Sequence, residues 1–139
     1  MENDNVSKLS QLGAIQRRIN SLEERIEELT EAATSIKGIA QAEKVQKSPS
    51  PPAWTAIVEE ADELRREVDR LQVELVAAES EARLLISRLD VPMSRKILTE
   101  VYVNGRSVAE AASVMGYTIQ HAYRIFNSAR QAINNVNNM

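Results

Sequence analysis

The chain has little of the chemistry that many enzymes and metalloproteins depend on. Its 139 residues include no cysteine, one histidine, one tryptophan and one phenylalanine. The lack of cysteine excludes a disulfide framework and a cysteine-ligated zinc site, and it is common in cytoplasmic proteins. His121 cannot form a histidine-based metal site by itself. Aromatic residues reach only 4% and charged residues 27%, which favours a helical, coiled-coil-rich protein over one with a large aromatic core.

Several longer motifs are missing as well. The sequence contains no signal peptide and no apolar run long enough to span a bilayer, so we expect no membrane span and a cytoplasmic location. It contains no glycine-rich phosphate loop, no nucleophile–base set and no cluster of metal ligands. We therefore expect a protein that is not an enzyme and that uses no metal or cofactor.

Acidic side chains are scarce at one end of the chain. Residues 93–139 carry five basic and two acidic side chains, and no acid follows Glu110. Residues 1–92 carry 12 basic and 18 acidic side chains. The net charge of −3 therefore combines +3 in the C-terminal part with −6 in the remainder. A basic segment of this kind is typical of the part of a protein that binds nucleic acid. The acidic charge of residues 1–92 needs no separate function, because the exposed surfaces of helices are commonly acidic.

Apolar residues recur in alternating steps of three and four over residues 12–36, which predicts one apolar seam along a helix. The members of this first seam are Leu12, Ile15, Ile19, Leu22, Ile26, Leu29, Ala33 and Ile36. We expect a helix from about residue 6 to residue 37 that Gly38 ends, with residues 1–7 frayed. Residues 39–47 could extend the helix or be irregular. Three prolines in residues 48–52 predict an extended linker.

A second seam with the same steps predicts a helix over residues 53–90. Its members are Trp54, Ile57, Ala61, Leu64, Val68, Leu71, Leu75, Ala78, Ala82, Leu85 and Leu89. The apolar face is widened by Val58, Val73, Val76, Ala77, Leu84 and Ile86, so it needs more than one partner helix. The most economical arrangement is an antiparallel hairpin whose surplus apolar face contacts another protomer. Parallel dimerisation of either helix is the alternative, because heptads do not decide between the two.

Residues 107–126 have the pattern of a helix-turn-helix. Ser107, with Glu110 three residues later, forms a capping-box sequence, and Gly116 can supply the left-handed residue that ends a first helix. Thr118 can cap a second helix two residues later. The turn is therefore very short, as a helix-turn-helix requires.

Small and apolar residues predict how this motif packs. Ala112 and Ala122 would let its two helices approach closely. A buried stripe is expected along the second helix, formed by Ala122, Ile125, Phe126, Ala129 and Ile133. A short helix over residues 95–103, capped by Ser94, would pack across the motif and complete a three-helix domain. The asparagine-rich tail after Ile133 is expected to fray.

The opposite face of the second helix is polar and free of acids. It carries Gln120, Arg124, Asn127 and Gln131. Gln, Asn and Arg pair with base edges, whereas a carboxylate in their place would repel phosphate. A helical hairpin with a merely solvated polar face is the alternative interpretation.

These patterns together predict an all-α protein in two parts. Residues 1–92 would form a long antiparallel helical hairpin of the coiled-coil type that oligomerises, with its loop at residues 48–52. Residues 93–139 would form a small three-helix helix-turn-helix domain that binds DNA.

The chain also resembles a known family over most of its length. The resemblance is carried by Ile19, Glu23 and Leu29 in the first helix, by residues 45–49, by the second long helix, and by residues 98–107 and 115–117. These are similar to small phage-encoded proteins of the ArpU/RinA type, which are assigned to late-gene transcription in phages and prophages of Gram-positive bacteria. Residues 98–117 also resemble region 4 of sigma factors, which reads a promoter element.

The resemblance implies which side chains meet DNA. Bases would be faced by Ile119, Gln120, Tyr123 and Arg124, and phosphates by Arg106 and Ser107. Thr118, His121, Asn127 and Arg130 complete the candidate DNA-binding set. Contact with phosphate or plain exposure are both open for His121, and Tyr123 could instead pack on the short helix.

The function that these expectations favour is a sequence-specific regulator of phage or prophage transcription. It would bind double-stranded DNA as a homo-oligomer in the bacterial host cytoplasm, as an activator of late genes. Two alternatives are a DNA-packaging recognition protein of the small-terminase type and a coiled-coil adaptor that binds RNA polymerase.

Overall fold

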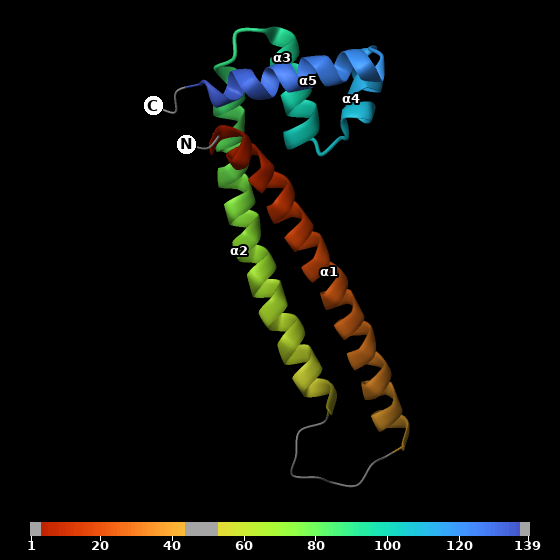
Figure 1. The fold of residues 1–139 in the computed structure, drawn as a ribbon. Coiled ribbons are helices and arrows are strands. Elements are labelled where there is room, and N and C mark those ends of the chain that lie inside the picture. The colour runs from red at the N-terminus through yellow and green to blue at the C-terminus, as the bar shows by residue number, and fades with distance from the viewer. Residues whose placement is uncertain (1–3, 44–52, 137–139) are drawn as a thin grey trace. The chain divides into compact units, whose positions relative to one another are not determined.

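The computed structural model describes residues 4–43 and 53–136, and over these residues the chain is all-α (Figure 1). The fold class is therefore confirmed at this level. The helices are α1 (Asp4–Glu43), α2 (Ala53–Ser87), α3 (Pro92–Leu98), α4 (Val108–Met115) and α5 (Ile119–Asn134), with the π-helical segment η1 (Thr99–Val103) directly after α3. The predicted linker at residues 48–52 and the patch at 45–49 lie outside the described residues.

The chain divides into two compact units. The first unit consists of Met1–Gln16 together with Glu74–Met139, and the second unit is Arg17–Val73. This division does not follow the expected boundary at residue 92, because the start of α1 and the end of α2 share one core with α3, α4 and α5. Whether residues 93–139 fold independently stays a prediction.

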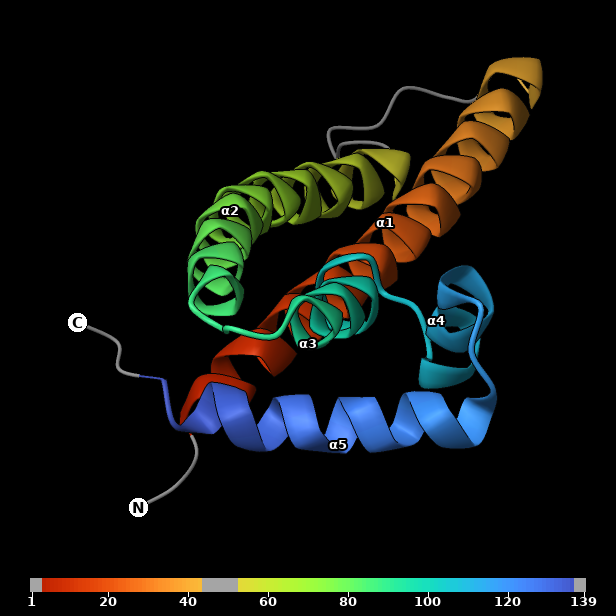
Figure 2. The same ribbon diagram turned by 90° about the horizontal axis from the view of Figure 1, so that it is seen from above.

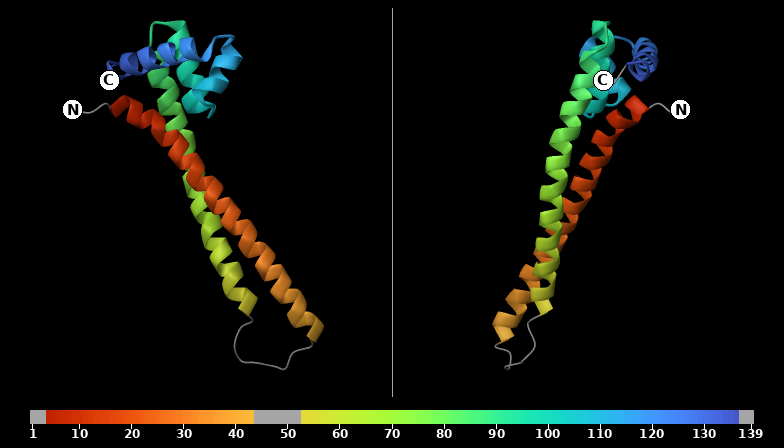
Figure 3. Two further views of the ribbon diagram at one scale, coloured as in Figure 1. Left: turned by 45° about the vertical axis from the view of Figure 1, so that its right-hand side comes forward. Right: turned by 90° about the vertical axis from the view of Figure 1, so that its left-hand side faces the viewer.

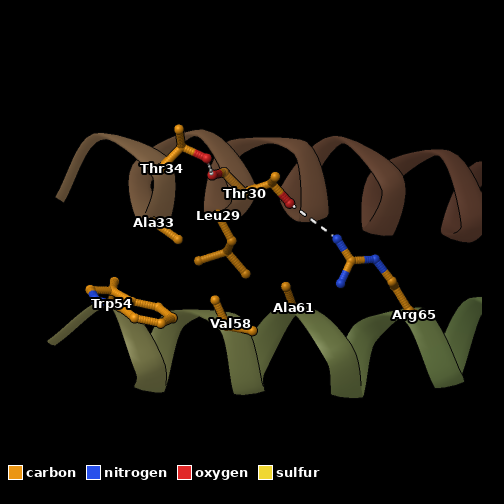
Figure 4. Close-up of a pocket in the computed structure, with 8 residues that line it drawn as sticks. All are labelled: Leu29, Thr30, Ala33, Thr34, Trp54, Val58, Ala61 and Arg65. Atoms are coloured by element: carbon orange, nitrogen blue, oxygen red, sulfur yellow. Dashed lines mark hydrogen bonds between the residues drawn. The ribbon is translucent and has the colours of Figure 1, made fainter. Parts of the chain in front are cut away.

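In the second unit, the segments of α1 and α2 lie side by side (Figure 3). The predicted seam residues within this unit are all buried or half-buried, as an apolar seam between two helices requires. Figure 4 shows Leu29 and Ala33 of α1 facing Val58 and Ala61 of α2, with Trp54 at one end. These residues help to line a hollow of about 190 Å³ between the two helices.

The first unit has a continuous apolar core. Its fully buried large side chains are Leu9 of α1, Ile97 and Leu98 of α3, and Ile133 of α5. Aliphatic side chains of this size each contribute roughly 1.5–3 kcal/mol when they leave water. Figure 2 shows α5 beside α3 and α4, with its last turn near the first turn of α1. The inner face of α5 thus packs on α3 and α4, and its opposite face lies in solvent.

Both expected ends of the first helix are wrong. The helix begins at Asp4, and Asn5 and Val6 are buried in the first unit, so this stretch is not frayed. It continues to Glu43 past Gly38, which we expected to end it. A glycine inside a helix costs only about 1 kcal/mol relative to alanine, and helix-forming residues on both sides of Gly38 can outweigh that cost.

The expected start of the short helix is also wrong. It begins at Pro92, after extended backbone at Val91, because proline is well suited to the first helical position. Ser94 is buried in the helix and does not cap it. The predicted continuation to residue 103 is π-helical, not α-helical. The helix expected to end near residue 90 ends at Ser87.

The tail prediction is wrong for Asn134, which lies in α5 and accepts a hydrogen bond from the backbone N–H of Val6 at 3.1 Å. Asn135 ends α5 in helical backbone, with its N–H bonded to carbonyls of the last turn. The remaining predicted tail residues, Asn137 and Asn138, lie outside the described residues.

Candidate nucleic-acid interface

The start of α4 is fixed by the predicted capping box. The Ser107 hydroxyl accepts a hydrogen bond from the Glu110 backbone N–H at 3.0 Å, and the Glu110 carboxylate accepts one from the Ser107 N–H at 2.9 Å. Two of the donors that every helix start leaves unpaired are thereby satisfied. Ser107 itself remains exposed, at the place where the resemblance implies a phosphate contact.

The turn between α4 and α5 is also as predicted. Gly116 has φ 77° and ψ 30°, a left-handed conformation, and the Tyr117 N–H reaches the carbonyl of Ala112 at 2.9 Å. This pairing is the usual way of closing a helix on a glycine. Thr118 then accepts a hydrogen bond from the His121 N–H at 3.1 Å and starts α5. Only residues 116–118 separate the two helices.

The inner face of α5 is held by small and aromatic side chains. Ala122, Ala129 and Ile133 have no exposed area, while Ile125 and Phe126 are half-buried against the same core. The ring of Phe126 stacks on that of Tyr102 in η1, with 5.9 Å between ring centroids. The predicted buried stripe is therefore confirmed, and it fixes the rotation of α5 about its axis.

The outer face of α5 is exposed and polar, as expected. Gln120, Arg124, Asn127 and Gln131 are all exposed. An aliphatic and an aromatic side chain are also exposed in the first turns of α5. Ile119 is 53% exposed and Tyr123 is 48% exposed. Of the two alternatives for Tyr123, this exposure favours an outward-facing side chain.

His121 and Arg124 border a hollow beside α5. They line it with Ile125 and Ser128 from α5 and with Val91, Met93 and Ser94 from the start of α3; its volume is about 450 Å³. The ring of His121 is exposed and meets Tyr117 edge-on at 4.8 Å, and the Tyr117 hydroxyl donates to Met93 Sδ at 3.1 Å. Sequence reasoning missed Met93, because nothing local indicates that residue 93 lies near residue 117.

Arg106 and Arg130, which are expected at the margins of the DNA-facing surface where phosphates would pass, both have partners within the protein. Arg106 Nε donates to Glu100 Oε1 at 2.7 Å, although its side chain remains 45% exposed. The guanidinium of Arg130 lies over the ring of Phe126 at 5.5 Å, close enough for a cation–π interaction. Both side chains are thus held in place near solvent.

Glu100 is the feature that sequence reasoning missed most clearly. It is buried in η1, and it accepts hydrogen bonds from Asn104 at 3.2 Å and from Arg106 at 2.7 Å. The Asn104 bond and the Arg106 charge lower the pKa of Glu100 below its ordinary value of 4.5, although burial opposes them. One available signal was an acid among apolar residues, flanked by Lys96 and Asn104 at four-residue spacing.

Clusters of metal ligands and membrane-spanning helices are both absent from the described residues. No group of three or more His, Cys, Asp or Glu side chains in this part of the chain is placed to hold a metal ion. In the same part, none of the helices combines the length and the apolar character needed to cross a membrane.

Comparisons with known protein families, with curated proteins and with solved structures find no match to this chain. The resemblance to phage regulators and to region 4 of sigma factors therefore rests on the sequence motifs alone.

Proposed function

We propose that the protein binds double-stranded DNA, with α4 and α5 forming a helix-turn-helix. In this proposal α5 enters the major groove, α4 crosses the backbone, and α3 with η1 supports both helices. The observation that carries the proposal is the outer face of α5. It begins directly after the turn at Gly116, it presents Gln120, Arg124 and Asn127 to solvent, and the chain has no acid beyond Glu110.

The chemistry of this face suits base recognition. A glutamine amide can bond an adenine edge at two points, and an arginine guanidinium can do the same with guanine. Gln120 and Arg124 lie four residues apart on one helix, so they project from the same side. Each correct pairing would contribute roughly 1–3 kcal/mol of discrimination against the wrong base. Ile119 could contact a thymine methyl group beside them.

The long helices support a second part of the proposal, an antiparallel hairpin that assembles with other copies. In the second unit, Ile26 lines a hollow with Val68, while Ala33, later in α1, lines a cavity with Val58, earlier in α2. This reversed order favours an antiparallel pair. On α2, Val73, Val76 and Leu84 are 72%, 68% and 56% exposed, an apolar surface that a second protomer could cover.

The biological role that we propose is regulation of phage or prophage transcription, with activation of late genes as the expected direction. This step rests on the resemblance to the ArpU/RinA-type proteins and to region 4 of sigma factors. The geometry of α4 and α5 is compatible with it, since such regulators present a recognition helix behind a short turn.

Selection of bound sequences from random duplex DNA would test the proposal. The full chain is expected to enrich one motif, and the double variant Gln120→Ala with Arg124→Ala is expected to lose that enrichment while it stays folded. Equal recovery of all sequences by the unmodified chain, at low and at moderate salt, would remove sequence-specific recognition from the proposal.

A protein partner is the second candidate, favoured by one observation. Val114 of α4 is 47% exposed, and Ile119 and Tyr123 of α5 are exposed to a similar extent. Exposed apolar and aromatic side chains are common at protein–protein contacts. RNA polymerase is the partner that the sigma-factor resemblance implies. Binding to purified polymerase that persists without DNA and changes little with salt would favour this candidate.

A further inference from the structure

A buried carboxylate lies next to an arginine of the proposed DNA-binding set. Glu100 is 9% exposed, and its Oε1 accepts hydrogen bonds from Arg106 Nε at 2.7 Å and from Asn104 Nδ2 at 3.2 Å. Its Oε2 lies 3.9 Å from Lys96 Nζ. A buried charge is costly unless it is paired and hydrogen-bonded, and these partners meet that requirement.

The loop before α4 is tied to the same place by its backbone. The Asn104 N–H donates to the carbonyl of Thr99 at 2.9 Å, and the Arg106 N–H donates to the carbonyl of Glu100 at 3.0 Å. Gly105 has φ 74°, which lets the chain reverse between these two bonds. Glu100 therefore holds Arg106 by two hydrogen bonds. Its backbone carbonyl accepts from the Arg106 N–H, and its side-chain carboxylate accepts from the Arg106 Nε–H.

These two hydrogen bonds leave part of the Arg106 guanidinium in solvent. An arginine has five N–H groups, and the bond to Glu100 uses the Nε–H. The Arg106 side chain is 45% exposed. The next residue, Ser107, is the N-cap of α4. A phosphate passing the start of α4 could be met by the exposed edge of the guanidinium.

We infer that Glu100 is a positioning residue for DNA binding, which holds Arg106 so that its guanidinium edge meets a DNA phosphate. The inference rests on the proposed function. An exposed arginine loses side-chain freedom when it binds, and a side chain that is already fixed loses less. The expected gain in affinity is about two- to tenfold, and it applies to all sequences alike because phosphate carries no sequence information.

The sign of the effect separates this inference from simple electrostatics. Removing an acid from a DNA-binding protein normally strengthens its attraction to phosphate. Glu100→Gln is nevertheless expected to weaken binding to a mixed-sequence DNA duplex by about two- to tenfold. The matched control is Glu79→Gln, which removes an exposed acid that pairs with Arg83 in the same unit at 2.9 Å. The control is expected to bind equally well or slightly better.

A double-mutant cycle gives the decisive comparison. Glu100→Gln is expected to have no effect on affinity once Arg106→Ala is present, because Glu100 acts through Arg106. An equal loss in both backgrounds, or no loss in either, would overturn the inference. Circular dichroism on each variant shows whether it is folded. If Glu100→Gln is not folded, Arg106→Lys decides: it keeps the charge but lacks the held Nε–H, so wild-type affinity for Arg106→Lys would overturn the inference.

The failure of the inference can be told apart from the failure of the proposed function. If the unmodified chain does not bind duplex DNA at any salt concentration, the proposed function fails and the inference fails with it. If the unmodified chain binds and the cycle shows no coupling, only the role of Glu100 is overturned.

Discussion

The side-chain amide of Asn5 donates hydrogen bonds to the backbone carbonyls of Ile133 at 2.7 Å and of Val136 at 2.9 Å. In return, the Asn134 side chain accepts a hydrogen bond from the Val6 N–H at 3.1 Å. These three side-chain to backbone hydrogen bonds join the first turn of α1 to the end of α5. Through these bonds the helix proposed to read DNA is anchored at the end opposite its capped start.

Asn5→Ala is expected to lower the free energy of unfolding by roughly 0.5–1.5 kcal/mol, because it removes two hydrogen bonds between the start of α1 and the end of α5. The loss stays small because the Ile133 carbonyl still accepts from the Val136 N–H, and because the change also removes the Asn5 Oδ1, a buried oxygen without a partner among the described residues. Chemical denaturation followed by circular dichroism measures this loss. Ser7→Ala, an exposed change two residues later in α1, is the control and should be close to neutral. Equal stability of the two variants would show that the Asn5 bonds contribute nothing.

Gly116→Val is expected to destabilise the first unit by about 1–3 kcal/mol. A Cβ at this position would meet no atom within 4 Å, so the penalty comes from the positive φ and not from a clash. Gly116→Asn is the matched control, since asparagine tolerates left-handed backbone better than β-branched residues do. If valine and asparagine shift the thermal melting temperature alike, the positive φ is not what makes glycine necessary.

Glu100 predicts how stability depends on pH. Its pKa is lowered in the folded chain by Asn104 and Arg106, so its charged form is the stabilising one. That contribution is complete above the ordinary value of 4.5 and is lost as the pH falls through the lowered pKa. The unmodified chain is therefore expected to lose more stability than Glu100→Gln as the pH is lowered from 4.5 through the lowered pKa. Parallel pH profiles of the two proteins would contradict this assignment.

The exposed apolar residues of α2 predict self-association. Val76→Asp combined with Leu84→Asp is expected to dissociate the assembly without unfolding the monomer, because both side chains are exposed. Val76 and Leu84 are better positions for testing self-association than the seam residues Leu71 and Leu75. Leu71 and Leu75 are half-buried, so an aspartate there could also destabilise the monomer. Gln72→Asp is the control, and sedimentation velocity gives the mass. A monomeric unmodified chain would rule out the assembly.

Local chemistry explains what could be predicted from the sequence. The bonds of Ser107 with Glu110 and of Thr118 with His121 join residues three apart, so the helix starts could be read directly. The left-handed turn at Gly116 is local as well. Heptad spacing likewise fixes which residues face inward, because side chains at steps of three and four share one helix face.

Other features depend on contacts that sequence spacing does not reveal. Asn5 and Ile133 are 128 residues apart, and nothing in either segment indicates the other. Glu100 and Arg106 are only six residues apart, but they meet because η1 is π-helical and Gly105 reverses the chain. The sequence pattern predicts an end at Gly38, but α1 continues past it because the helix penalty of one glycine is small.

The most direct test of the central claim compares Arg124→Ala with Arg130→Ala on the selected duplex, on its single-base variants and over a salt series. If α5 reads bases, Arg124→Ala relaxes the preference at one or two base positions. Arg130→Ala instead weakens binding to all duplexes alike and lowers the salt slope by about one. If Arg124→Ala leaves both affinity and base preference unchanged, the outer face of α5 does not read DNA, and the partner-binding function becomes the better account.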